Sequence, residues 1–162
     1  YKLAKKFFKK KKINLIKNYY FYDLKKRSKK INFKNLNILY ISEPFKEKYE
    51  IESLKYLLKT LDSNYFSFSS KIFIKLHPKD TKTKYDNIIK SYKHKLNIII
   101  SDEFDAVELL NKCKWIIGLT SYLLFMSARL NKMTYHCKLP NQKNIKLLKN
   151  KKIKSFHNLK LK

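Results

Sequence analysis

Two hydrophobic patterns alternate along the middle of this chain. Short runs rich in β-branched and aromatic residues predict buried strands. These strands are expected at residues 37–41, 71–76, 96–100, 114–119 and 132–137. Between them, apolar residues recur at helical spacing, as they do at Ile51, Leu54, Leu57 and Leu58. The helices are expected at residues 50–61, 84–92, 105–113 and 121–131.

The alternation of strand and helix predicts the fold class. One helix between consecutive strands, with short connections, is typical of a parallel sheet that has helices on both faces. Uninterrupted apolar strands such as 97–100 and 115–119 favour a sheet that is covered on both sides. We therefore expect an α/β domain with a doubly wound, Rossmann-like parallel sheet over residues 36–140.

Positive charge is concentrated at the two ends of the chain. The 162 residues have a formal net charge of +27. Residues 1–34 contain 14 basic residues and one acid, and residues 141–162 contain eight basic residues and no acid. This predicts a basic N-terminal arm or linker over residues 1–35 and a basic tail over residues 141–162, which is either a helix or loose chain. Three interpretations of the arm are open: an amphipathic helix on an anionic membrane, a helix packed on another domain, or a solvated linker.

Composition excludes several kinds of site. Gly118 is the only glycine, so neither common Gly-rich phosphate loop is possible. Cys113 and Cys137 stand apart without CxxC spacing, which predicts neither a zinc site nor a disulfide framework and fits a reducing cytoplasm. No apolar run approaches the roughly 20 residues that a transmembrane helix needs. We expect no metal site.

Two polar clusters fall at the carboxyl ends of predicted strands, where ligands bind in open parallel sheets. His77–Pro78 ends the strand at 71–76. Pro78 stops that strand and restricts His77 to extended backbone, so the imidazole is aimed beyond the sheet edge, where it can donate to a phosphate. Thr120–Ser121 precedes the last helix and would offer hydroxyls and N–H groups to an anion. The alternatives are a histidine that only caps a strand and an ordinary serine N-cap.

Weaker nucleotide-binding candidates follow the strand at 96–100. Glu103, Asp105 and Glu108 are placed to touch a ribose or base. A solvated turn and a helix cap, with Asp105 as the N-cap, is the alternative interpretation. The remaining histidines are expected to be structural or exposed, and the tryptophan to be in the core: His94, His136, His157 and Trp115.

The order of these parts resembles a known family. The segments "NILYISEPF", "KIFIKLHPKD" and "NIIISDEFDAVELLNKCKWIIGLTSYLLFMSARLNKMTYH" resemble the C-terminal, donor-binding half of bacterial GT-B sialyltransferases, including the polysialyltransferase and lipooligosaccharide sialyltransferase families. The resemblance covers about residues 36–138 and implies that residues 36–140 are a nucleotide-sugar-binding domain, one Rossmann-like half of a GT-B fold. It implies CMP-sialic acid as donor, with no cofactor and no metal. His77–Pro78 matches the HP motif, whose histidine assists departure of CMP, and Thr120–Ser121 matches the paired hydroxyl motif that holds the donor phosphate.

The chain departs from that family in two respects. Relatives often have Glu-Ala in the last helix and then Gly and Pro before the last strand, where this sequence has Ser127–Ala128, Asn131 and Met133. The acidic D/E-D/E-G motif that supplies the catalytic base is absent, and in the family it belongs to an N-terminal domain, which here would have to precede Tyr1. We therefore expect the chain alone to bind donor without transferring the sugar.

The partners that the resemblance implies are a nucleotide-sugar donor and a glycan acceptor of the capsule or lipooligosaccharide. The basic arms fit a peripheral enzyme on the cytoplasmic face of an anionic bacterial plasma membrane, where each lysine contributes about 1 kcal/mol. Two alternatives keep the fold: a CDP-glycerol glycerophosphotransferase or other capsule glycosyltransferase domain, and an inactive remnant of a truncated gene. A nucleic-acid-binding protein is a third alternative. It is disfavoured because only Arg27 and Arg129 among 39 basic residues are arginine, the usual reader of guanine, and because the central domain is much less basic than its arms.

Overall fold

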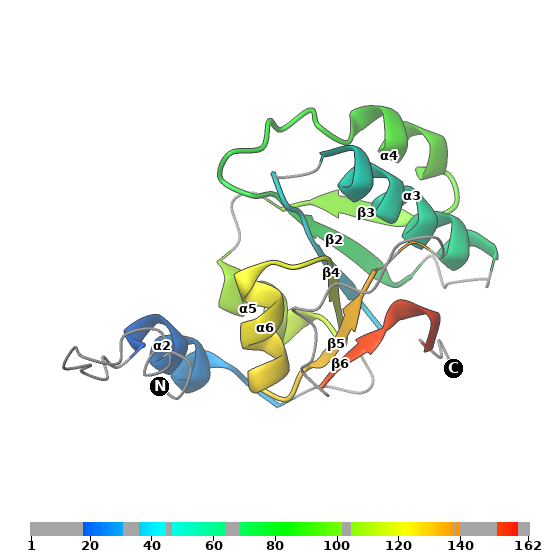
Figure 1. The fold of residues 1–162 in the computed structure, drawn as a ribbon. Coiled ribbons are helices and arrows are strands. Elements are labelled where there is room, and N and C mark those ends of the chain that lie inside the picture. Colours follow the sequence, from blue (N-terminus) through cyan, green and yellow to red (C-terminus); the bar gives the residue numbers. More distant parts are fainter. Residues whose placement is uncertain are drawn as a thin grey trace.

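A parallel β-sheet forms the centre of the fold in this computed structural model (Figure 1). The structure describes residues 18–30, 36–44, 47–63, 69–101, 105–137, 139 and 152–158. Within them the sheet has six strands, β1 (Ile38–Ile41), β2 (Lys71–Lys75), β3 (Asn97–Ile100), β4 (Trp115–Gly118), β5 (Met133–His136) and β6 (Ile153–Ser155). All neighbouring strands are parallel, in the order β3-β2-β1-β4-β5-β6.

Helices cover both faces of this sheet (Figure 1). The helices are α2 (Tyr19–Arg27), α3 (Glu47–Ser63), α4 (Asp86–Tyr92), α5 (Ala106–Lys112), α6 (Tyr122–Arg129) and the 3₁₀ turn η2 (Phe156–Asn158). One core cluster joins α3 and α4 to the sheet, and a second joins α2, α5 and α6 to the other face. Strand β1 contributes Ile38 and Tyr40 to the first cluster and Leu39 and Ile41 to the second, because successive side chains point to opposite faces.

The predicted fold class is confirmed. The strand order is that of a doubly wound, Rossmann-like sheet, and the five predicted strands and four predicted helices form close to their expected bounds. Trp115 is 1 % exposed and lies in the core, as expected. The two cysteines are buried free thiols. In the described part of the chain, no helix is both long and apolar enough to cross a membrane.

Helix α2 lies in the basic N-terminal segment and packs on this same domain, an arrangement that none of the three interpretations of that segment anticipated. Leu24 is buried in the second core cluster, and the guanidinium of Arg129 lies 4.1 Å from the ring centroid of Phe21. Just beyond the helix, the buried ammonium of Lys132 donates to the backbone oxygen of Lys29 over 2.7 Å. The division of the chain near residues 35 and 140 stays a prediction.

The C-terminal tail contributes a strand that the pattern did not predict. Strand β6 pairs in parallel with β5 at the edge of the sheet, and Phe156 in η2 is buried in the first core cluster. The histidines follow their expectation: His94 is exposed, His136 is buried, and His157 is exposed with a ring nitrogen 2.9 Å from the Tyr56 hydroxyl. Part of the basic tail is therefore a component of the sheet.

Candidate functional site

The candidate site is a cavity of about 520 Å³ at the carboxyl edge of the sheet. The chain leaves β1 toward β2 on one side, whereas β4 and β5 lie on the other side, so the switch point of the doubly wound sheet falls between β1 and β4. Segments that follow β1, β2 and β4 line the cavity, namely Ser42–Pro44, Leu76–Pro78 and Thr120–Leu123. The structure thus brings the two predicted clusters, His77–Pro78 and Thr120–Ser121, into one cavity.

A tight turn after β2 holds His77 in place. The backbone N–H of His77 donates to Asp80 Oδ2 over 3.0 Å, and the N–H of Asp80 donates to the carbonyl of His77 over 2.8 Å. The N–H of Lys79 donates to Nδ1 of the imidazole over 3.1 Å. Because Nδ1 accepts this bond, the neutral ring carries its hydrogen on Nε2. His77 is therefore fixed as a donor through Nε2, with Pro78 beginning the turn.

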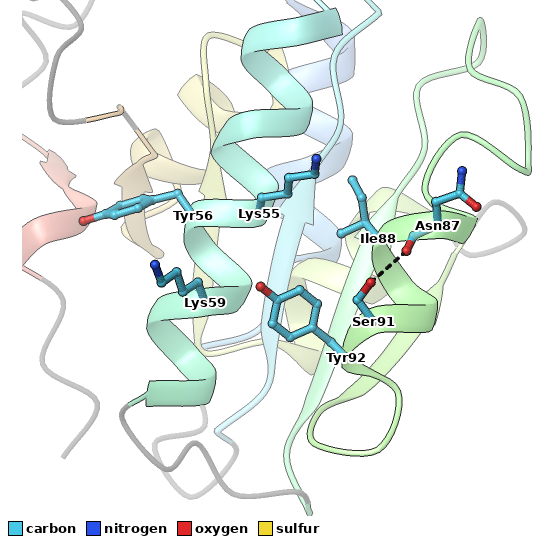
Figure 2. Close-up of a pocket in the computed structure, with 7 residues that line it drawn as sticks. All are labelled: Lys55, Tyr56, Lys59, Asn87, Ile88, Ser91 and Tyr92. Carbon is cyan, nitrogen blue, oxygen red and sulfur yellow. Dashed lines mark hydrogen bonds between the residues drawn. The ribbon is translucent and has the colours of Figure 1, made fainter.

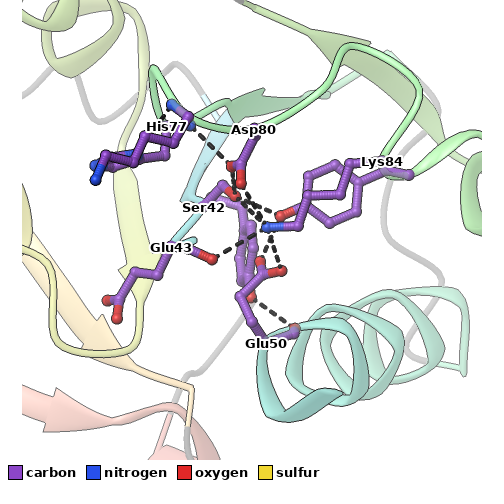
Figure 3. Close-up of polar contacts among 9 residues, drawn as sticks. Ser42, Glu43, Glu50, His77, Asp80 and Lys84 are labelled. Atoms are coloured by element: carbon purple, nitrogen blue, oxygen red, sulfur yellow. Dashed lines mark hydrogen bonds and ion pairs between the residues drawn. The ribbon is translucent and has the colours of Figure 1, made fainter. Parts of the chain in front are cut away.

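A buried ionic cluster stands behind this turn (Figure 3). We call it the Lys84 cluster, and it consists of Ser42, Glu50, Asp80, Lys84 and Tyr85. Lys84 Nζ lies 2.9 Å from Asp80 Oδ1 and 3.2 Å from Glu50 Oε2, and the three side chains are 4 %, 4 % and 0 % exposed for Lys84, Asp80 and Glu50. Tyr85 donates to Glu50 Oε1 over 2.6 Å. Asp80 accepts from the hydroxyl of Ser42 as well as from the backbone of His77, so the cluster ties the end of β1 to the histidine turn.

The two carboxyl groups of the Lys84 cluster differ in pKa. Burial raises the pKa of Glu50, and this outweighs the hydrogen bond from Tyr85 and the charge of Lys84. Burial also acts to raise the pKa of Asp80, but the hydrogen bonds from Ser42, Lys84 and the His77 N–H outweigh it, so its pKa is lowered. Burial beside Glu50 raises the pKa of the Tyr85 phenol, which keeps it a neutral donor. Asp80 is thus the anion that accepts at the histidine turn.

Thr120 and Ser121 lie at the N-terminus of α6. Ser121 is the N-cap, and its Oγ accepts from the N–H of Leu124 over 3.1 Å, which leaves its own hydroxyl hydrogen available to a ligand. Thr120 is engaged by Glu43, which follows β1: the Thr120 hydroxyl donates to Glu43 Oε2 over 2.8 Å, and its backbone N–H donates to Glu43 Oε1. The Glu43 carboxylate thus accepts from the same Thr120 groups that the sequence predicts as donors to a bound anion.

Of the three weaker candidates, the two that the structure describes do not line this cavity. Glu103 lies outside the described residues. Asp105 occupies the N-cap position of α5 without a side-chain cap bond, and it forms an ion pair with Arg27 of α2. Glu108 is exposed and pairs with Lys112 over 2.5 Å. Neither Asp105 nor Glu108 lines the cavity, although Ala106 between them does.

Two tyrosines at the cavity were missed by sequence reasoning. Tyr20 of α2 and Tyr122 of α6 both line it, with ring centroids 6.2 Å apart. Burial, followed by the negative charge of Asp105, raises the pKa of Tyr20. The side chain amide of Asn18 donates to the Tyr122 hydroxyl and so links the start of α2 to α6. The N-terminal segment therefore contributes an aromatic ring to the site, and no local pattern signals this.

The residues at which this sequence differs from the resembling family do not line the cavity. Ser127 and Ala128 are buried on α6, where the hydroxyl of Ser127 donates to the carbonyl of Leu124 over 2.8 Å. Met133 begins β5. Asn131 has a φ of 59°, in the left-handed region where glycine is favoured and asparagine is tolerated. Asparagine thus fills a backbone conformation that suits the glycine of the relatives.

A second, smaller cavity of about 360 Å³ lies between α3 and α4 (Figure 2). Its lining combines lysine, tyrosine and small polar side chains: Lys55, Tyr56, Lys59, Asn87, Ile88, Ser91 and Tyr92. The hydroxyl of Ser91 is turned to its own helix, where it donates to the carbonyl of Asn87 over 3.1 Å. This cavity shares no lining residue with the one at the switch point.

The comparison with known proteins agrees with the resemblance. No curated protein sequence matches the chain. A family model described as alpha-2,8-polysialyltransferase (POLYST) matches residues 1–137. That match covers most of the 162 residues and includes α2 as well as the strands that carry the site. The chain therefore belongs to the alpha-2,8-polysialyltransferase family, whose members are sialyltransferase-type glycosyltransferases that use a nucleotide-sugar donor and a glycan acceptor.

Proposed function

We propose that this chain is the donor-binding half of a GT-B sialyltransferase and that its switch-point cavity binds the nucleotide of CMP-sialic acid. The observation that carries the proposal is the meeting of His77 and Thr120–Ser121 in one cavity at the carboxyl edge of the sheet. The family match favours a sialic acid donor over CDP-glycerol, which would occupy a similar site.

The side chains around the cavity suit a leaving phosphate. Transfer breaks the bond between the sialic acid carbon and the phosphate oxygen, and negative charge grows on the phosphate as CMP leaves. His77 Nε2–H, the Thr120–Ser121 hydroxyls and the N-terminus of α6 supply donors to that charge. Such donors accelerate transfer because they bind the transition state more strongly than the ground state. The Lys84 cluster acts through His77, as a positioning device, because Asp80 accepts the His77 backbone N–H.

We also propose that these 162 residues bind donor without transferring the sugar. Among the described residues that line the cavity, Glu43 is the one carboxylate, and it lies beside the Thr120 donors that we assign to the donor phosphate and not to the acceptor. An acidic base on another domain would then have to activate the acceptor hydroxyl. A clear rate of sialic acid transfer by the isolated chain would contradict this.

Two further parts of the proposal concern the setting of the reaction. We propose that transfer needs no metal ion, because protein donors meet the phosphate charge; addition of EDTA to an enzyme with both domains should leave its rate unchanged. We also propose that the lysine-rich segments hold the enzyme on the cytoplasmic face of the bacterial plasma membrane, where a capsule or lipooligosaccharide acceptor is built. Sedimentation with anionic but not neutral liposomes is the expected result, and equal sedimentation with both would contradict it.

Calorimetric titration tests the donor site. CMP should bind the wild-type chain and UDP should bind it much more weakly. His77→Ala should weaken CMP binding, whereas the control His94→Ala should not, because His94 is exposed and does not line the cavity. Equal affinities for CMP and UDP, or equal CMP binding by wild type and His77→Ala, would contradict the proposal. Tighter binding of CDP-glycerol than of CMP-sialic acid would favour the glycerophosphotransferase alternative.

A further inference from the structure

Glu43 occupies the part of the cavity that the proposed function assigns to the donor phosphate. Its carboxylate takes both donors of Thr120, the backbone N–H and the hydroxyl, the latter over 2.8 Å. These donors lie just before the N-terminus of α6, where the helix dipole favours a negative charge. A phosphate that is to use Thr120 must therefore take it from Glu43.

The backbone on either side of Glu43 is held firmly. The N–H of Ser42 donates to the carbonyl of Lys75 over 3.0 Å, and the Ser42 hydroxyl belongs to the Lys84 cluster. Lys84 Nζ donates to the carbonyl of Glu43 over 3.0 Å, and Pro44 follows directly and restricts the backbone of Glu43. Figure 3 shows the Glu43 side chain extending away from this cluster. The carboxylate can consequently leave Thr120 by side-chain rotation, without movement of the loop.

The negative charge of Glu43 opposes the entry of a phosphate into the cavity. The Glu43 carboxylate and a phosphate near Thr120 repel each other, and both cannot accept from the same two donors. Glu43 satisfies these donors and keeps Thr120 oriented toward the cavity. With ligand present, the same carboxylate weakens phosphate binding.

We propose that Glu43 is a displaceable internal anion that holds the phosphate-binding groups of Thr120 in the empty domain and gives them up to the donor phosphate. This inference rests on the proposed function, since it assumes that the cavity binds the donor phosphate. Glu43 is accordingly a positioning residue that sets the affinity for phosphate-bearing ligands, and it does not discriminate between nucleobases.

The test compares ligands with and without phosphate. CMP and cytidine are titrated calorimetrically into the wild type, Glu43→Gln and Glu43→Ala, with Glu52→Gln as the control that removes the same charge from α3, outside the cavity. Both Glu43 variants should bind CMP about tenfold more tightly, a difference of about 1.4 kcal/mol, and should bind cytidine as the wild type does. Glu52→Gln should match the wild type for both ligands. Glu43→Gln keeps an acceptor for Thr120, so it remains informative if Glu43→Ala does not fold.

The outcomes separate this inference from the proposed function. If the wild type binds CMP and His77→Ala weakens that binding, but the Glu43 variants bind CMP equally or more weakly, Glu43 is not a competitor of the phosphate and the donor site stands. A parallel gain for cytidine would also overturn the inference, because the effect would then not depend on phosphate. If neither the folded wild type nor the Glu43 variants bind CMP, the proposed function fails and the inference fails with it.

Discussion

Replacing Lys84 by methionine removes the cation from a buried cluster while retaining most of the side chain's volume. Lys84 Nζ lies 2.9 Å from Asp80 Oδ1 and 3.2 Å from Glu50 Oε2, and all three side chains are at most 4 % exposed. At an effective dielectric constant of about 20, each attraction at this separation amounts to roughly 5 kcal/mol before desolvation. Desolvation of the ammonium offsets part of this sum. Since the substitution leaves two buried carboxyl groups without their cation, we expect the free energy of unfolding to fall by about 3–5 kcal/mol.

Urea unfolding at pH 7 measures this loss. Trp115 is the only tryptophan and is buried in β4, so its fluorescence reports on the core of the sheet. Lys95→Met is the matched control, because Lys95 pairs with Asp62 over 3.1 Å while its side chain is 62 % exposed. Such a surface pair contributes less than about 1 kcal/mol. The double variant Lys84→Met/Glu50→Gln should be more stable than Lys84→Met, because one of the two uncompensated charges is gone.

The pH dependence of this loss provides a second check. Lys84 acts to lower the pKa of both carboxyl groups, so its removal should raise the pKa of Glu50 further and raise the pKa of Asp80 from its lowered value. Protonation of the two groups then restores stability to Lys84→Met as the pH falls. The difference between wild type and Lys84→Met should consequently shrink between pH 7 and pH 4.5. A loss of stability in Lys84→Met no larger than that in Lys95→Met at pH 7, or a loss that is the same at both pH values, would show that the buried cation does not stabilise the cluster.

Three further predictions concern Asp80, Asn131 and Leu24. Because the pKa of Asp80 is lowered in the folded protein, the unfolded state binds more protons as the pH falls through about 3.8, and acid removes the stability that Asp80 contributes. In Asp80→Asn the free energy of unfolding should therefore depend less on pH in this acid range, and an unchanged pH dependence in urea melts would contradict this. Because Asn131 has a φ of 59°, Asn131→Gly should leave the melting temperature nearly unchanged, whereas Asn131→Val should lower it through a loss of about 1–2 kcal/mol in the free energy of unfolding. Equal melting temperatures of the two variants would contradict this. If α2 is integral to the fold, Leu24→Ala should lower the free energy of unfolding by about 2–3 kcal/mol, whereas Tyr22→Ala should lower it by less than about 0.5 kcal/mol because Tyr22 is 55 % exposed. Equal losses for the two variants in urea melts would mean that α2 is only loosely attached.

Local pattern was sufficient for the elements of the central domain. Apolar or β-branched residues make up most of β1 to β5, and the spacing of Leu54, Leu57, Leu58 and Leu61 gives α3 its buried face. Strand β6 escaped prediction because it has three residues with an exposed lysine at its centre, so no hydrophobic run marks it. It forms because β5 offers an edge to which it can pair.

The site was predictable where topology alone places its residues. In a doubly wound sheet β2 and β4 both neighbour β1, so His77 and Thr120 at their carboxyl ends are brought to one edge. The Lys84 cluster was missed, although one signal for it exists. Glu50 lies four residues before Leu54 and seven before Leu57, and thus on the apolar stripe of α3, where a charge requires a buried partner.

The packing of α2 could not be predicted from local pattern. Its sequence, "YYFYDLKKR", exposes most side chains and buries only Leu24 fully, so its amphipathic signal is weak. The contacts that fix it reach residues far away along the chain, among them the ion pair of Arg27 with Asp105. The same packing brings Tyr20 to the cavity, which explains why a segment that looked like a basic arm contributes to the candidate site.

A crystal structure of the chain with CMP would test the proposed donor site by locating the bound phosphate. We expect the phosphate at the carboxyl edge of β1 and β4, within hydrogen-bonding distance of His77 Nε2 and of the hydroxyls of Thr120 and Ser121. We also expect that the Glu43 carboxylate has left Thr120. CMP bound elsewhere, for example between α3 and α4, or bound at the switch point with its phosphate away from His77 and Thr120, would contradict the proposed donor site.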